Sequence, residues 1–216
     1  ALKSDGSLWR TNKNAPNGWE QLVDANVTSL DCGGSHATFI KTDGSLWTLG
    51  SNTHGALGDG TYEPRNEPFM VVDSSVVSVT AGGLHGNFTI FVKSDGSLWA
   101  MGLNDFGQFG SGNTSNPTRP VEVLPNSVST ANPSEFGYIL KSEGALLYHG
   151  GATGHQNGGT THATPGIYLP EGVLQVANPY LQLVYLKQDG SLWKQQHSGQ
   201  AVQLETEGVA KLASTD

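Results

Sequence analysis

Three histidines in one short segment come nearest, by type and spacing, to a chemical site. His149, His155 and His162 follow one another at intervals of six and then seven residues. Neutral imidazole is a common metal ligand, but this spacing matches neither a helical His pair nor the ligand pattern of a zinc finger. We therefore expect no metal site and interpret the segment as a repeat that has diverged.

Candidate catalytic groups are few. The sequence contains no Gly-x-Ser-x-Gly motif, and its one cysteine, Cys32, falls at the end of an expected strand. Glu63 and Glu67 would form an acid–base pair only if the fold placed them together. The glycine-rich segments are not flanked by a strand and a helix in the order that a dinucleotide site needs. We expect no enzyme, no catalytic residues and no cofactor.

The charge balance bears on the class of partner. Eleven Lys and Arg against 19 Asp and Glu give a formal net charge of -8, with no cluster of basic residues. This disfavours binding to the phosphate backbone of nucleic acid. Because no run of about 18 apolar residues occurs, we expect no membrane insertion. We expect the protein to be a monomer.

One heptapeptide recurs along the chain and predicts the fold. "KSDGSLW" stands at 3–9 and 93–99, with the close copies "KTDGSLW" at 41–47, "KQDGSLW" at 187–193 and "KSEGALL" at 141–147. Asp-Gly between two β-rich runs is a strong hairpin signal, because Gly adopts positive φ without strain and Asp tolerates it. The sequence therefore predicts hairpins at about 1–10, 37–50, 88–102, 136–149 and 182–194.

Each hairpin is flanked by two further strand patterns. "VTSLDCGG" and "VVSVTAGG" precede hairpins, and "PFMVV" and "PVEVL" follow them. Units of four strands that recur at intervals of roughly 40 to 50 residues are typical of propeller blades. The chain starts within a hairpin and ends on a first-strand pattern, "GVAKLASTD". We predict one all-β domain over 1–216: a five-bladed β-propeller of four-stranded antiparallel blades, whose ring is closed by N- and C-terminal strands that share one blade.

These motifs resemble those of the regulator of chromosome condensation repeat family, whose blades carry an "AGG.H" strand end, a "DG.L..G" hairpin and an "N..GQLG.G" loop. The second blade has "CGGSH", "DGSLWTLG" and "NTHGALGDG", and the third has "AGGLH", "DGSLWAMG" and "NDFGQFGSG". The period covers the whole chain, but only these two blades carry every element. The resemblance implies a propeller that works as an interaction platform or inhibitor.

Residues that recur in register are interpreted as structural. The Trp of the hairpin should pack between adjacent blades, and the His after the Gly-Gly break should bond backbone within its own blade. Trp19 lies outside this register, so we expect it at the surface. The structural set is Trp9, Trp47, Trp99, Trp193, His36 and His85.

Successive connections of an up-and-down blade alternate between its two ends. The Gly-Gly breaks and the long loops after the hairpins therefore share one end, which we call the long-loop face, and the Asp-Gly turns share the other. Variable loops on a rigid scaffold are where binding usually resides. Our candidate binding residues on the long-loop face are His54, Tyr62, Glu63, Arg65, Phe106, Asn113, Arg119, His155, Gln156 and His162.

The sequence thus favours a non-catalytic scaffold that binds a protein through the long-loop face, with Tyr62, Phe106 and Arg65 as anchors. A glycan-binding, lectin-like propeller is the alternative, suggested by clefts between similar blades and by abundant Trp, Asn and Asp. The first residue is Ala1 rather than Met, and sequons occur at Asn26, Asn87 and Asn113. The compartment is left open, with a preference for a secreted or cell-surface location.

Overall fold

The computed structural model describes most of the chain. The described residues are 1–82, 87–126, 128–132, 136–150, 162–169, 171–177, 183–195, 201–206, 208–210 and 212. They group into two compact units, the first made of 1–104 with 115–125 and the second of 105–114 with 126–216. No helix among the described residues is long and apolar enough to cross a membrane.

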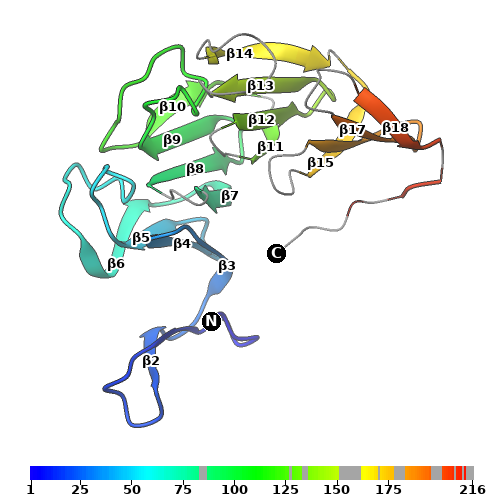
Figure 1. Cartoon of the computed structure of the whole chain (residues 1–216). Coiled ribbons are helices and arrows are strands. Elements are labelled where there is room, and N and C mark those ends of the chain that lie inside the picture. Colours follow the sequence, from blue (N-terminus) through cyan, green and yellow to red (C-terminus); the bar gives the residue numbers. More distant parts are fainter. Residues whose placement is uncertain are drawn as a thin grey trace. The chain divides into compact units, whose positions relative to one another are not determined.

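The first unit contains three antiparallel sheets (Figure 1). Sheet A pairs β1 (Leu8–Thr11) with β2 (Trp19–Val23). Sheet B contains β3 (Val27–Cys32), β4 (His36–Lys41), β5 (Leu46–Gly50) and β6 (Arg65–Val72) in sequence order. Sheet C contains β7 (Val76–Ala81), β8 (Phe88–Lys93), β9 (Leu98–Gly102) and β10 (Val121–Leu124), also in sequence order.

The second unit contains two sheets with the same up-and-down order. Sheet D contains β11 (Val128–Asn132), β12 (Phe136–Lys141), β13 (Leu146–Gly150) and β14 (His162–Leu169). Sheet E contains β15 (Val173–Ala177), β16 (Val184–Lys187), β17 (Leu192–Gln195) and β18 (Ala201–Glu205). The all-β prediction of four-stranded antiparallel blades is confirmed for sheets B to E. The count of five blades, the closure of the ring and the single domain stay predictions.

The hairpin of sheet C shows how the repeated heptapeptide folds. Lys93 and Ser97 bond through their backbones, with N–O 3.0 Å, and the Gly96 amide donates to the Lys93 carbonyl at 2.9 Å. Gly96 has φ +79°, a region that side chains other than glycine rarely adopt. The glycines at the same turn position, Gly6, Gly44, Gly144 and Gly190, also have positive φ.

Side chains of the heptapeptide form a closed network above this turn. The Ser97 amide and Oγ donate to Asp95 Oδ1 at 2.9 and 2.6 Å, and the Trp99 indole Nε1 donates to Ser97 Oγ at 2.8 Å. The Lys93 ammonium lies 4.2 Å from the centroid of the Trp99 ring, within cation–π range. The same lysine-over-tryptophan contact occurs at Lys3–Trp9, Lys41–Trp47 and Lys187–Trp193.

The turn also joins one sheet to the next. The Gly44 carbonyl accepts a hydrogen bond from the Val76 amide at 2.9 Å, so the turn of sheet B touches the first strand of sheet C. A Cβ on Gly44 would lie 2.7 Å from the backbone N of Ser75, closer than packing allows. The equivalent bonds run from Val27 to Gly6, from Val173 to Gly144 and from Val209 to Gly190.

The hydrophobic core lies between neighbouring sheets. Between sheets A and B, Leu8 and Val23 pack with Phe39 and Leu49, and Trp47 lies against them. Sheets B and C are joined by an analogous cluster, against which Trp99 packs; its buried residues are Ile40, Leu46, Val76, Val79, Phe91 and Met101. Sheets D and E are joined by a third cluster, against which Trp193 packs; its buried residues are Leu140, Val173, Leu183 and Tyr185. Burial between sheets explains why each sheet needs a neighbour.

Candidate functional site

The connection from β5 to β6, residues 51–64, is built around a buried asparagine. Asn52 is 1% exposed. Its Oδ1 accepts from the Leu57 amide at 3.0 Å, while its Nδ2 donates to Asp59 Oδ1 at 3.1 Å and to the Thr61 carbonyl at 2.9 Å. One side chain thus ties together three points of the loop. The loop is an ordered surface because its backbone groups are satisfied from within.

A partly buried ion pair between Asp59 and Arg65 joins this loop to β6. Asp59 Oδ2 accepts from Arg65 Nε at 2.5 Å, and Asp59 Oδ1 accepts from the Thr61 amide and hydroxyl at 2.9 and 2.8 Å. The Asp59 side chain is fully buried and that of Arg65 is 40% exposed. Burial acts to raise the pKa of Asp59, but the hydrogen bonds from Arg65 and Thr61 outweigh it, so this pKa lies below its ordinary value.

The exposed residues of the loop stand on this polar core. Tyr62 is 58% exposed, more than Trp19 at 43% or Phe106 at 39%. The Glu63 amide donates to Thr61 Oγ1 at 3.2 Å, and His54 Nδ1 lies 3.0 Å from Thr53 Oγ1. The three predicted residues therefore lie on one ordered loop. Arg65 follows the loop as the first residue of β6, and its Nε is committed to Asp59.

Residues 115–120, before β10, lie against the same loop. The Gly60 amide donates to the Thr118 carbonyl at 2.8 Å. A Cβ on Gly60 would lie 2.6 Å from Arg119 Nη2, so the Arg119 guanidinium covers this glycine. The structure thus places the predicted residue Arg119 beside the loop that carries Tyr62.

His36 is connected to the loop 51–64 through the hydroxyl of Thr89. This histidine is 4% exposed, and its Nε2 lies 2.9 Å from the hydroxyl of Thr89 in β8. Thr89 Oγ1 in turn donates to the carbonyl of Ala56 at 2.9 Å. This bond links sheet B to sheet C and both to the loop, and the predicted bond of His36 to backbone within its own blade stays a prediction.

The remaining predicted residues belong to the second unit or lie outside the described residues. Phe106, 39% exposed, and the exposed Asn113 belong to the second unit, whereas Tyr62 belongs to the first. His85, His155 and Gln156 lie outside the described residues. His162 begins β14, where only its backbone is described. Among described residues, no three His, Cys, Asp or Glu are close enough to hold a metal ion.

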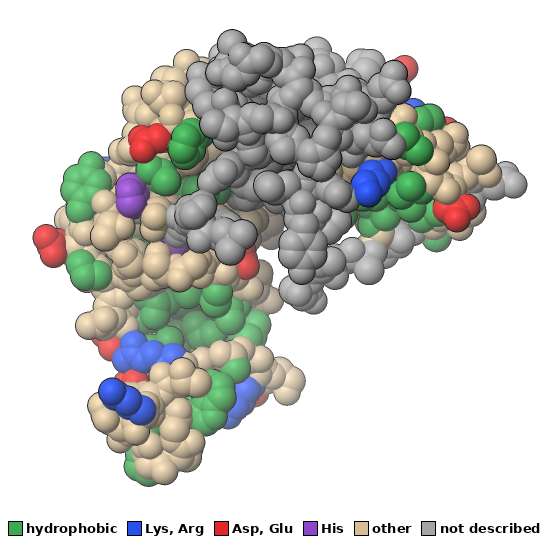
Figure 2. Space-filling model, viewed as in Figure 1, with side chains coloured by type: hydrophobic (Ala, Val, Ile, Leu, Met, Phe, Trp, Pro, Cys, Tyr) green, Lys and Arg blue, Asp and Glu red, His purple; other side chains and the backbone are tan. Residues whose placement is uncertain are grey.

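The structure describes the surroundings of two groups with catalytic potential, Glu67 and Cys32. Glu67 pairs with Arg10 of sheet A, with Oε1–Nη2 3.2 Å. Cys32 is an exposed residue, but partial burial of its thiol, and then the charge of Asp31, raises the pKa of that thiol and so disfavours the thiolate form. On the visible face, charged side chains are scattered rather than gathered into one patch of a single sign (Figure 2).

The tryptophans of the repeat are half-buried rather than fully enclosed. Trp47, Trp99 and Trp193 each lie beside an aromatic partner on the adjacent strand, with interplanar angles of 8°, 12° and 7°. Each also carries a lysine ammonium over its ring. Trp19, as expected, is at the surface, with 43% exposed.

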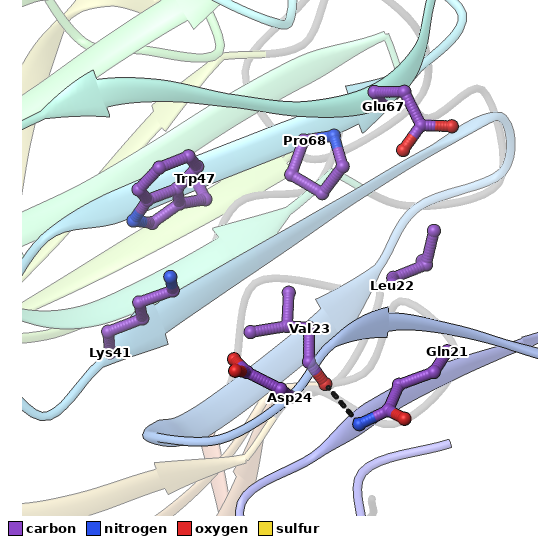
Figure 3. A pocket seen from close by; sticks show the side chains of 8 residues that line it. All are labelled: Gln21, Leu22, Val23, Asp24, Lys41, Trp47, Glu67 and Pro68. Carbon is purple, nitrogen blue, oxygen red and sulfur yellow. Dashed lines mark hydrogen bonds between the residues drawn. The ribbon is translucent and has the colours of Figure 1, made fainter.

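A groove of about 550 Å³ lies between β2 of sheet A and strands β5 and β6 of sheet B (Figure 3). Leu22, Val23 and Asp24 line one side, and Trp47 and Pro68 line the other. Pro68 stands where the pairing of β5 with β6 shifts between Thr48–Phe69 and Gly50–Arg65. Such a bulge tolerates proline, which has no amide hydrogen to donate.

Several curated proteins are similar in sequence. Human RCC2 is 30% identical over 141 residues, which covers 62% of this chain and 27% of that protein. An RCC2 homologue of Danio rerio is 28% identical over 163 residues, 71% of this chain and 32% of that protein. The X-linked retinitis pigmentosa GTPase regulator homologue of Caenorhabditis elegans is 35% identical over 105 residues, 46% of this chain and 8% of that protein. The chain thus spans less than a third of these relatives.

Solved structures share the fold. Prp20p of Saccharomyces cerevisiae, described together with its binding to Gsp1p and histones, has a TM-score of 0.66 at 20% identity over 82% of this chain and 48% of that one. Human WBSCR16 has a TM-score of 0.65 at 19% identity over 86% of this chain and 52% of that one. At these identities the likeness shows the fold alone.

The preference for a secreted or cell-surface location is wrong. The RCC2 relatives and the yeast neighbour are intracellular proteins, and nothing in the comparisons points to secretion. That preference rested on the absence of an initial Met and on the three sequons. A sequon is glycosylated only in a protein that enters the secretory pathway, and neither feature shows that this one does.

Family models place the repeats along the chain. Two models match, and both are described as the regulator of chromosome condensation (RCC1) repeat. The first matches residues 43–88 and 95–132, and the second matches residues 27–56 and 76–108. The matched segments include sheets B and C and the loop 51–64, where the hairpin, the Gly-Gly break and the glycine-rich loop all occur. Together with the RCC2 relatives and the Prp20p fold, they show that this chain belongs to the RCC1-like repeat family.

Proposed function

We propose that this chain is a non-catalytic scaffold that binds a protein partner through its long-loop face. The observation that carries the proposal is the loop 51–64, in which a buried network of Asn52, Asp59 and Arg65 holds Tyr62 exposed. An exposed aromatic side chain on a preorganised backbone costs little entropy on binding, and tyrosine is enriched among interface hot spots.

Similar proteins support this type of function. The structure of Prp20p is described with its binding to Gsp1p and histones, and another structure holds yeast RCC1 (Prp20) bound to Kap60. Protein binding is thus described for one protein that shares this fold. The partner of this chain is a separate question, because its loop 51–64 has its own sequence.

The glycan alternative has less support. A sugar-binding tryptophan needs a free ring face. Lysine ammonium groups cover Trp9, Trp47, Trp99 and Trp193 at 3.8 to 4.6 Å from the ring centroids. Tryptophans that carry a lysine and pack against the core are better explained as parts of the repeat.

Affinity capture from a lysate of the source organism tests the proposal, with the chain as bait. Tyr62→Ala should remove the captured partner, while the control Met70→Ala, which truncates another exposed side chain on the outer strand β6, should keep it. Arg65→Ala is a poor probe, because it would also uncover Asp59. Capture that is equal for both variants, at equal melting temperatures, would contradict the assignment of Tyr62.

A further inference from the structure

We propose that the groove between sheets A and B is a second docking site, which receives an extended, basic peptide segment of a partner protein. This site lies on the side of the sheets and is separate from the loop 51–64, so it goes beyond the proposed function. The groove volume of about 550 Å³ lies in the range of ligand sites. Leu22, Val23, Trp47 and Pro68 supply apolar walls on which aliphatic stems of lysine or arginine side chains can lie.

The charges around the groove are complementary to a basic segment. Asp24, which follows β2 of sheet A, and Glu67, in β6 of sheet B, both line the groove, and Gln21 adds a polar amide (Figure 3). Asp24 has no ion-pair partner among the described residues. Glu67 is bonded to Arg10 through Oε1 alone, and its side chain is 74% exposed. Both carboxylates can therefore accept hydrogen bonds from an incoming cation.

Lys41 is the one cation that lines the groove, and it is already engaged. Its ammonium lies 4.4 Å from the centroid of the Trp47 ring. The same contact is made by the equivalent lysines of three other hairpins, so it belongs to the repeat rather than to this groove. The groove thus offers the unpaired carboxylate of Asp24 and the second oxygen of Glu67 to a cation, whereas its ammonium is committed to Trp47.

The pair of carboxylates is absent from the equivalent positions of the next junction, between sheets B and C. In each sheet, one residue of the outer strand pairs with the repeated tryptophan: Gln21 with Trp9, Met70 with Trp47 and Glu122 with Trp99. These three residues therefore occupy equivalent positions, and other positions of the outer strands can be aligned from them. By that register, the counterparts of Asp24 and Glu67 at the next junction, between sheets B and C, are Asp73 and Arg119. One of the two acids is replaced by a base there, so the repeat does not require two acids.

Peptide binding to the whole chain tests the site. The probes are a decapeptide that alternates Arg with Ala and a control that alternates Glu with Ala, followed through the indole N–H signals of the five tryptophans. The Arg-Ala peptide should shift the signal of Trp47 more than that of Trp99, and the Glu-Ala peptide should shift neither. Asp24→Asn and Glu67→Gln should each weaken binding about fivefold.

The matched control is Asp73→Asn, which removes the same charge at the equivalent position one sheet further on. It should leave the affinity within twofold of the unchanged protein. Equal losses for Asp24→Asn and Asp73→Asn would show attraction to net charge alone and overturn the proposal, as would binding of the Glu-Ala peptide or a shift confined to Trp99. Because Glu67→Gln also weakens the contact with Arg10, the Asp24→Asn result decides the test if the melting temperature of Glu67→Gln falls.

Discussion

The hairpin of sheet C and the loop 51–64 of sheet B are each organised by one aspartate, but the two aspartates differ. Asp95 is exposed, accepts from Ser97, and has counterparts at residues 5, 43 and 189 with the same kind of bond. Asp59 is buried and pairs with Arg65, and a serine, Ser111, stands at its place in the next repeat. A network that recurs in the hairpins of sheets A, B, C and E builds the sheets, whereas one that occurs once shapes a particular surface.

Removal of a repeated tryptophan should destabilise the protein most. Trp99→Ala removes the ring that lies beside Phe91 and against the core between sheets B and C. The free energy of unfolding should fall by about 3 kcal/mol, the lower end for a large aromatic because Trp99 is only half-buried. Chemical denaturation measures this loss. Trp99→Leu should lose less stability than Trp99→Ala, because leucine occupies the equivalent position, Leu147, in sheet D. Equal losses for the two variants would contradict the packing role of Trp99.

The unique network should respond locally. Asp59→Asn leaves Arg65 without its carboxylate and weakens the bonds from Thr61, at a cost of about 2 kcal/mol, reduced because Arg65 is partly exposed. Hydrogen exchange should accelerate at the amides of Leu57 and Thr61 while the amides of β8 stay protected. Faster exchange throughout sheets B and C would mean that the pair stabilises the unit rather than the loop.

A repeated hydrogen bond should contribute less than either. Ser97→Ala removes the acceptor of the Trp99 indole N–H and one donor to Asp95. The expected loss in the free energy of unfolding is about 1 kcal/mol. Ser45→Ala and Ser191→Ala, which remove the same acceptor from Trp47 and Trp193, should give similar values by denaturation. A loss confined to one hairpin would break the equivalence of the repeats.

The smallest effect is the dependence of stability on pH. The side-chain hydrogen bond from Ser97, and then its amide, lower the pKa of Asp95. A carboxyl group whose pKa is lower in the folded state adds stability above its unfolded pKa of about 4 and loses that stability as pH falls through the folded pKa. Melting temperature should therefore decline below about pH 4. Asp95→Asn should make that decline shallower, and an unchanged slope would argue against the bond.

The hairpins and the repeat were predictable, because Asp-Gly turns and the Trp register are local features of the sequence. The pair of Asp59 and Arg65 was missed: Arg65 was interpreted as a binding residue, although an aspartate six positions earlier was a possible partner. The bond from His36 to Thr89 joins different sheets, so the sequence alone could not identify it. The groove beside Trp47 depends on the approach of β2 to a bulge at Pro68, which no sequence pattern specifies.

The most direct test of the difference between the repeated and the unique network is to measure partner capture and melting temperature together for Tyr62→Ala and Ser97→Ala. We expect opposite results for the two variants. Tyr62→Ala should lose the partner at an unchanged melting temperature, and Ser97→Ala should keep the partner at a lower melting temperature. Retention of the partner by Tyr62→Ala, or its loss in a folded Ser97→Ala protein, would contradict the claim that the unique loop binds and the repeated hairpin only supports it.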